Sequence, residues 1–135
     1  NTAGTYGTFS VDVNGAWTYS ADNAQAAIQA LSTSDTLTDT FTVVSKDSSA
    51  SNTVTVTING LDDTATVSAD TKSVIEDDAA TLTTSGTVTV TDVDAGDAFA
   101  IAQTNTAGTY GTFSVDVNGA WIYSADNTQA AIQAL

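Results

Sequence analysis

Clusters of aspartate and glutamate are the part of this sequence whose residue types and spacing suit chemistry. The candidate metal ligands are Asp47, Asp62, Asp63, Glu76, Asp77, Asp78, Asp92, Asp94 and Asp97. Crowded carboxylates repel, since two like charges about 4 Å apart cost about 4 kcal/mol at an effective dielectric constant of about 20. A cation removes that cost, and closely spaced Asp oxygens beside a glycine turn favour Ca²⁺, whereas Zn²⁺ prefers His and Cys. The clusters therefore predict calcium binding.

Turn formation is the other explanation for aspartate in such sequences, because its side chain bonds its own backbone. We assign the scattered acids to a solvated surface of this kind: Asp12, Asp22, Asp35, Asp39, Asp70 and Asp116. The text DVDAGD, residues 92–97, matches the alternating Asp ligands and the glycine of an EF-hand loop. The match is partial, because the rest of that loop and its closing Glu are missing.

The charge balance and the missing residue types exclude several functions. The formal net charge is −14, from 16 Asp and Glu against 2 Lys and Arg, which repels nucleic acid and anionic membranes. Cys and His are absent, so a His-based triad and a Cys nucleophile are excluded, and a glycosidase-like carboxylate pair is the enzymatic alternative left. No apolar run approaches the roughly 18 residues of a membrane span. We expect a protein that is not an enzyme, binds no nucleic acid and does not insert into a membrane.

One stretch of the sequence occurs twice. Residues 1–31 and 105–135 differ only at Thr18/Ile122 and Ala24/Thr128, a repeat with a period of 104 residues. A period near a hundred residues is typical of one domain in a tandem array. We therefore predict that residues 1–61 are the C-terminal part of one repeat and that residues 62–135 are the N-terminal part of the next.

Short alternating runs between Gly, Asn, Asp and Ser turns predict β-strands. The repeated text predicts a hairpin, in which residues 6–13 turn at Asn14-Gly15, a pair that tolerates positive φ at both positions, and return through Trp17 and Tyr19. Asp22-Asn23 then caps one or two helical turns within residues 24–31. The other expected strands are residues 37–45, 53–58, 64–68, 86–91 and 98–103.

About seven short strands in one repeat predict an all-β immunoglobulin/cadherin-like β-sandwich in tandem array. In the order of a repeat, residues 62–135 supply strands A to E, and residues 1–61 supply strands D to G of the repeat before. We expect Trp17, Tyr19, Trp121 and Tyr123 in the core. Alternating strand directions put the two ends of a repeat at opposite poles, so that repeats form a rod.

The predicted strand directions also assign each acidic cluster to one of the two ends of a repeat. Residues 76–78 and 62–63 fall at one pole, and residues 92–97 and Asp47 at the other. When one repeat stacks on the next, the first group and the following repeat's residues 92–97 converge on one junction. The expected partners are therefore neighbouring repeats of the same chain, joined through Ca²⁺-bridged linkers.

The text GTYGTFSVDVNGAWTYSADN, followed by QAL, TLTDTFTVVSKD and TVTVTING, resembles the VCBS and cadherin-like extender repeats of giant bacterial repeats-in-toxin (RTX) adhesins. The resemblance covers essentially the whole chain and is strongest to the extender region of a marine ice-binding adhesin. It implies calcium-stiffened β-sandwiches outside the cell, at the bacterial surface, which hold a distal ligand-binding domain away without contacting its ligand. Where many relatives read Gly-x-Asn-Asp-x-Pro, this chain reads Gly60-Leu61-Asp62-Asp63-Thr64.

Two functions compete on this basis. The first is a passive spacer stiffened by calcium. The second is a ligand-binding module in which the rows Thr53-Thr55-Thr57 and Thr87-Thr89-Thr91 present hydroxyl and methyl groups to ice or carbohydrate. Threonine also simply suits the solvent face of a strand, and rows of three on twisted sheets make no large flat face. We therefore expect the spacer.

Overall fold

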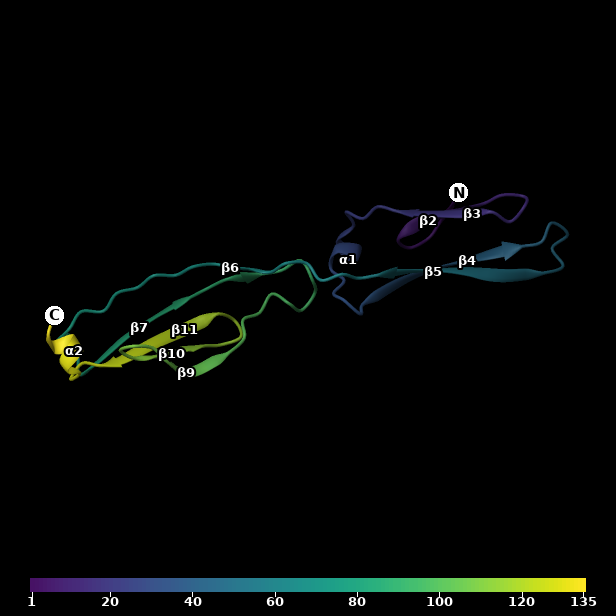
Figure 1. The fold of residues 1–135 in the computed structure, drawn as a ribbon. Coiled ribbons are helices and arrows are strands. Elements are labelled where there is room, and N and C mark those ends of the chain that lie inside the picture. The colour runs from purple at the N-terminus through teal and green to yellow at the C-terminus, as the bar shows by residue number, and fades with distance from the viewer. The chain divides into compact units, whose positions relative to one another are not determined.

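The computed structural model describes residues 1–135, and its regular secondary structure is nearly all β, with 42% of residues in strands and 6% in helices. The strands form several antiparallel sheets (Figure 1). The chain divides into two compact units: unit 1 is Asn1–Asp63 with Val93–Ala95, and unit 2 is Thr64–Asp92 with Gly96–Leu135. No helix is both long enough and apolar enough to cross a membrane.

Unit 1 contains a three-stranded antiparallel sheet, a two-stranded hairpin and one short helix. The sheet consists of β1 (Thr2–Ala3), β2 (Gly7–Val11) and β3 (Trp17–Ala21), the hairpin of β4 (Thr36–Val44) and β5 (Ser51–Asn59), and the helix is α1 (Ala26–Gln29). Alternation along the strands turns Phe9 and Phe41 toward each other. Their rings stack with centroids 4.7 Å apart, and the two residues are 3% and 5% exposed. Sheet and hairpin thus pack face to face around an aromatic core.

Unit 2 is built around a four-stranded antiparallel sheet in the order β7-β11-β10-β9. These strands are β7 (Thr81–Thr87), β9 (Gln103–Ala107), β10 (Thr112–Val115) and β11 (Ala120–Asp126), beside the short pair β6 (Thr66–Val67) and β8 (Val90–Thr91) and the helix α2 (Ala130–Gln133). Leu82, Ala125 and Ile132 form its core, with Tyr123 packed against them.

The repeated text folds twice with one register. Phe9 pairs with Tyr19 in unit 1 as Phe113 pairs with Tyr123 in unit 2. The surroundings differ, because β3 is an edge strand whereas its counterpart β11 pairs with β7 along seven residues. Only unit 1 has the β4–β5 hairpin over this sheet. The two copies of the repeated text therefore share one strand register but have different neighbouring strands.

Two predicted strands were wrong. Residues 98–102 form no strand, and the strand begins at Gln103, because Phe99 and Ile101 are 56% and 90% exposed and have no ladder to join. The strand expected at residues 86–91 is two elements, since β7 already begins at Thr81 and ends at Thr87. Its text TLTTSGT has few apolar residues and becomes a strand through pairing with β11.

The turn of the repeated hairpin also differs from the prediction. Only Gly15 has a positive φ, 86°, and Asp12 organises the turn. The Gly15 N–H donates to the Asp12 carbonyl at 3.1 Å, and the Asp12 carboxylate accepts from the N–H groups of Asn14 and Ala16 at 2.8 and 2.9 Å. This is a turn closed by a glycine bulge, not a two-residue turn with positive φ at both positions.

The predicted helix is shorter than expected and lacks its predicted cap. It spans Ala26–Gln29, and its N-cap residue, Gln25, makes no side-chain capping bond. The Asp22 carboxylate instead accepts from the Ala24 N–H at 2.9 Å, before the helix begins.

Candidate metal-binding site

Three acids of unit 1, Asp62, Asp63 and Asp94, lie beyond the C-terminal end of α1. Asp94 is 3% exposed, and its Oδ2 accepts a hydrogen bond from the Asp63 N–H at 2.6 Å. The neighbouring Ala95 N–H donates to the Ala30 carbonyl, the C-cap of α1, at 3.1 Å. The segment Val93–Ala95 therefore fixes a buried carboxylate against the Asp63 backbone.

Asp62 is fixed by a reciprocal contact with Thr33. The Asp62 carboxylate accepts from the Thr33 N–H, and the Asp62 N–H donates to Thr33 Oγ1 at 3.2 Å. The bond from the Thr33 backbone, followed by that from its side chain, holds the pKa of Asp62 below its usual value. Asp62 and Asp63 thus belong to an ordered boundary segment.

In unit 2, the loop of residues 76–78 is tied to α2 through Asp77. The Asp77 carboxylate accepts from Gln133 Nε2 at 2.9 Å and from Asn127 Nδ2 at 3.1 Å, and the Asp77 N–H donates to Asn127 Oδ1 at 3.3 Å. The Gln133 and Asn127 bonds keep the pKa of Asp77 below its usual value. Glu76 and Asp78 flank this anchored residue.

Two of the remaining predicted ligands, Asp92 and Asp97, flank the segment Val93–Ala95 in the sequence, and the third, Asp47, lies in a distant turn. Asp92 follows β8, and Asp97 follows Gly96, whose φ is 93°; β7 separates this loop from residues 76–78 along the chain. Asp47 lies in the β4–β5 turn, where its carboxylate accepts from the hydroxyls of Ser45 and Ser49 at 2.7 and 2.8 Å. These two bonds, with one from the Ser49 N–H, lower the pKa of Asp47 to about 2. Its carboxylate is engaged by the turn.

The predicted ligands do not form a complete calcium site in residues 1–135. No group of three or more acidic side chains lies close enough to hold a metal ion. The donor set is all oxygen, which suits Ca²⁺, but Ca²⁺ takes about 6 to 8 oxygen ligands. The candidates are divided between two units, and within unit 2 between separate loops.

The repeated text relates the two acidic groups. Asn23 and Gln29 of unit 1 are the counterparts of Asn127 and Gln133, and the same bond joins each pair: Gln29 Nε2 to the Asn23 carbonyl at 2.9 Å, and Gln133 Nε2 to the Asn127 carbonyl at 3.0 Å. In unit 1 this pair lines a cavity together with Asp63. In unit 2 the same pair holds Asp77.

Asp39, which we predicted to be a solvated acid, is buried in unit 1 at 2% exposure. Its carboxylate accepts from the N–H groups of Thr5, Tyr6 and Gly7 at 2.7, 3.0 and 3.0 Å, and from the Tyr19 hydroxyl at 2.7 Å. Burial alone would raise the pKa of Asp39, but these hydrogen bonds outweigh it and hold the pKa below its usual value. Burial, and then the bond and charge of Asp39, raise the pKa of Tyr19 to about 12.

The sequence does contain a signal for this burial. Leu37, Asp39, Phe41 and Val43 alternate along β4 on one face, which is the face that carries the core residue Phe41. An acid at such a position must be fully hydrogen-bonded, because burying an unpaired charge is prohibitive.

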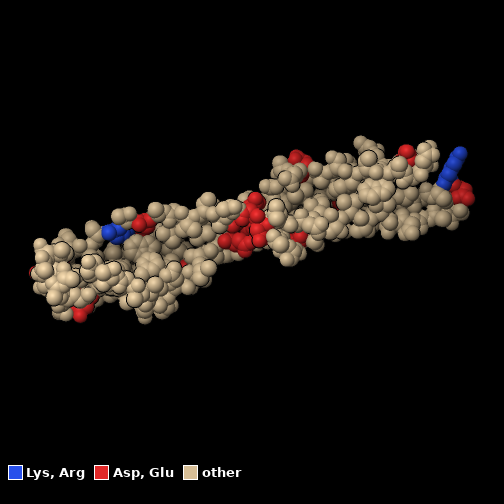
Figure 2. Space-filling model, viewed as in Figure 1, with Lys and Arg blue, Asp and Glu red and all other residues tan.

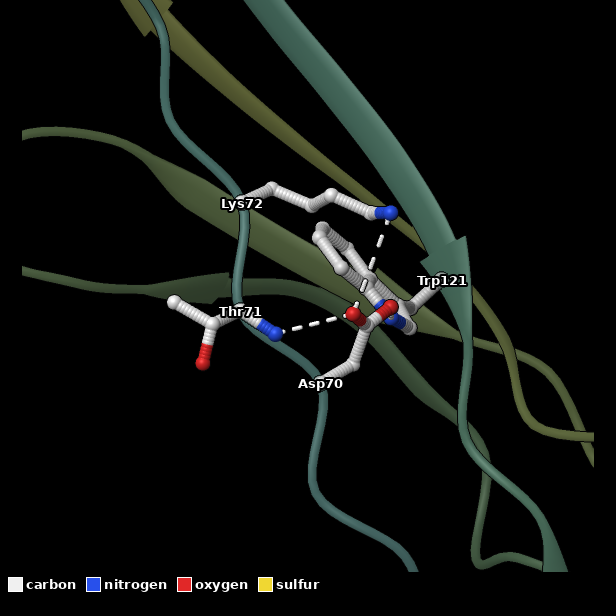
Figure 3. Close-up of polar contacts among 4 residues, drawn as sticks. All are labelled: Asp70, Thr71, Lys72 and Trp121. Atoms are coloured by element: carbon white, nitrogen blue, oxygen red, sulfur yellow. Dashed lines mark hydrogen bonds and ion pairs between the residues drawn. The ribbon is translucent and has the colours of Figure 1, made fainter.

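Asp70, which we also predicted to be a solvated acid, is exposed, but its carboxylate has specific partners. Figure 3 shows its carboxylate directed at the Trp121 indole, whose Nε1–H donates to Asp70 Oδ2 at 3.1 Å. The Thr71 N–H donates to Asp70 Oδ1 at 2.8 Å, and Lys72 Nζ lies 3.9 Å from the same oxygen. Trp121 is half-buried by these contacts, whereas Trp17 is 48% exposed, so the prediction of a core position was wrong for Trp17.

Charged side chains cover little of the face seen in Figure 2, where Asp and Glu form a few separate patches on a largely uncharged surface. No protein-family model matches the chain, and no curated protein matches it either. The contacts of the acids and the repeated text are therefore the basis for a functional proposal.

Proposed function

We propose that this chain is a structural spacer: an extender repeat of a bacterial cell-surface adhesin, stiffened by Ca²⁺, which holds a distal ligand-binding domain away from the cell. The proposed fold of a complete repeat is an immunoglobulin/cadherin-like sandwich in tandem array. Its proposed partners are the neighbouring repeats, and it acts outside the cell.

One observation supports the proposed calcium site. The pair Asn127 and Gln133 binds the Asp77 carboxylate in unit 2, and the identical pair in unit 1 shares a cavity with Asp63. A repeat that contains both halves has Asp77 and Asp63 at the same amide pair. Asp94 joins them through its bond to the Asp63 N–H.

Such a gathering of carboxylates favours a hard cation. Asp94 is almost fully buried, and like charges brought close in a partly buried place destabilise one another unless a counterion is present. Ca²⁺ accepts carboxylate, amide and backbone oxygens in flexible geometry, and extracellular modules bind it at about 10⁻⁴ to 10⁻³ M. Bridging by the ion would remove hinge freedom at the boundary of residues 60–64.

The test uses a chain of two complete repeats, each reading residues 64–135 followed by residues 32–63. Its unfolding temperature should rise with millimolar Ca²⁺ relative to chelator, and less with Mg²⁺. Asp63→Asn and Asp94→Asn should remove most of that rise, whereas Asp35→Asn, with the same change of charge on an exposed residue, should retain it. Equal unfolding temperatures in Ca²⁺ and chelator would reject the calcium site.

A second function is favoured by the outer face of the β4–β5 hairpin. The register sets three pairs of exposed threonines side by side: Thr38/Thr57, Thr40/Thr55 and Thr42/Thr53. This array is wider than the row of three expected from sequence, whereas residues 87–91 do not form one row, because β7 ends at Thr87. Such a face suits ice or carbohydrate, so Thr40→Lys with Thr55→Lys should abolish ice-growth inhibition or glycan binding if this function is correct. A spacer has no such activity to lose.

A further inference from the structure

The repeated text is buried to different extents in its two copies. Phe9 is 3% exposed, whereas its counterpart Phe113 is only half-buried, and Tyr6 is half-buried whereas Tyr110 is 54% exposed. The sequences around these residues are identical, so the difference comes from what packs on them. In unit 1 that is the β4–β5 hairpin, through Phe41 and Asp39.

The turn that binds Asp39 in unit 1 has the same form in unit 2. The Gly4 N–H donates to the Gly7 carbonyl at 2.8 Å, and the Gly108 N–H donates to the Gly111 carbonyl at 2.7 Å. The side chain of Gln25 donates to the Tyr6 carbonyl at 2.7 Å, as does that of Gln129 to the Tyr110 carbonyl at 2.8 Å. The hydrogen-bond donors of this turn therefore have the same arrangement in unit 2, where no counterpart of the β4–β5 hairpin packs on them.

Those donors are the backbone N–H groups of Thr109, Tyr110 and Gly111, with the Tyr123 hydroxyl beside them. Their counterparts in unit 1 all donate to Asp39. In unit 2 the three N–H groups donate to no side chain, and Thr109 and Tyr110 are exposed. Successive N–H groups directed at one point form an anion-binding concavity.

Unit 2 also has a cavity over aromatic residues of its sheet. It has a volume of about 420 Å³, and its lining includes Phe113, Trp121 and Tyr123 together with Asp70, Lys72 and Val74. In unit 1 the counterparts of Phe113 and Tyr123 enclose the Phe41 ring, with centroids 4.7 and 6.0 Å away. Unit 2 therefore offers a place for a carboxylate and a place for a phenyl ring, at the spacing of residues i and i+2 of a strand.

We propose that unit 2 carries a binding site for a β-hairpin with the sequence of residues 36–59. The carboxylate of that hairpin's Asp39 accepts from Thr109, Tyr110, Gly111 and Tyr123, and its Phe41 packs on Phe113 and Tyr123. The site leaves β7 in place, because β7 pairs with the edge of β11 whereas the hairpin covers the face of the sheet. Hairpin and β7 together close the sandwich that each unit contains only in part.

The inference is independent of calcium, and its test is done in chelator. The full chain is lengthened after Leu135 by a second copy of residues 32–63, the text that follows the first copy of the repeat. Tethering supplies a high effective concentration, which compensates for the marginal stability of an isolated hairpin. Hydrogen exchange and NMR shifts of the Thr109, Tyr110 and Gly111 amides are the readout.

Exchange of these three amides should slow by at least about tenfold relative to the 135-residue chain, because bonds to a carboxylate protect them. Asp39→Asn in the added copy should abolish most of that protection, whereas Asp35→Asn in the added copy should retain it. Phe41→Ala in the added copy should weaken the protection of all three amides together. Unchanged exchange on lengthening, or equal protection with Asp39→Asn, would overturn the inference.

Discussion

The carboxylate of Asp39 lies 2.7 Å from the hydroxyl of Tyr19, across the interface between the β4–β5 hairpin and the sheet of unit 1. The donor is a neutral phenol whose pKa is raised to about 12, and the acceptor is a carboxylate whose pKa is lowered. The proton therefore stays on Tyr19 at neutral pH. This bond, with three backbone N–H groups, lets a charge occupy a core position.

Replacing the charged acceptor should destabilise unit 1. Asp39→Asn retains the shape but removes the charge that three N–H groups and a hydroxyl are arranged to bind, so we expect a loss of about 2 to 3 kcal/mol. Hydrogen exchange of unit 1 amides measures it without assuming that both units unfold together. Asp35→Asn is the matched control, and an equal effect of both substitutions would contradict the role of Asp39.

Lowering the pH should remove the stabilisation that the Asp39 carboxylate gives to unit 1. The pKa of Asp39 is lower in the folded state than the ordinary value of about 3.9. The contribution is therefore fully present above that ordinary value and is lost as the pH falls through the folded pKa. The stability difference between the unsubstituted chain and Asp39→Asn should shrink as the pH is lowered from about 6 toward 2. A difference that stays constant over this range would show that protonation of Asp39 is not involved.

The stack of Phe41 on Phe9 should contribute far more to the free energy of unfolding than an exposed aromatic ring does. Phe41→Ala leaves a cavity against Phe9, which is 3% exposed, and should cost about 3 to 5 kcal/mol. Phe99→Ala removes a ring that is 56% exposed, and its effect should stay within about 0.5 kcal/mol. Chemical denaturation compares the two variants, monitored by exchange of unit 1 amides for Phe41→Ala and of unit 2 amides for Phe99→Ala. Similar losses would contradict the stack as the centre of this core.

Sequence patterning predicted the all-β class and several strands because alternation is a local property. The strands expected at residues 37–45 and 53–58 are β4 and β5, with bounds displaced by one or two residues. The burial of Asp39 was missed because its donors at residues 5–7 lie more than thirty positions away. No local pattern shows that three N–H groups of a distant turn converge on one carboxylate.

The strand β7 and the candidate metal site were hard to predict for related reasons. Thr83, Thr84 and Ser85 carry no apolar alternation, and they form a strand because β11 presents a complete ladder. The acids are easily recognised in the sequence, but their grouping depends on contacts such as Asp77 with Gln133, separated by 56 positions. The relation between Asp77 and Asp63 emerges only when the two copies of the repeat are compared.

Small-angle scattering of the chain of two complete repeats tests the proposed calcium-stiffened spacer most directly. In millimolar Ca²⁺ the scattering should fit one extended particle with a sharply defined maximum dimension. In chelator the maximum dimension should shorten or broaden, because the boundary at residues 60–64 regains its hinge freedom, and Asp63→Asn with Asp94→Asn should reproduce that change in Ca²⁺. Identical scattering curves with Ca²⁺ and with chelator would contradict the account.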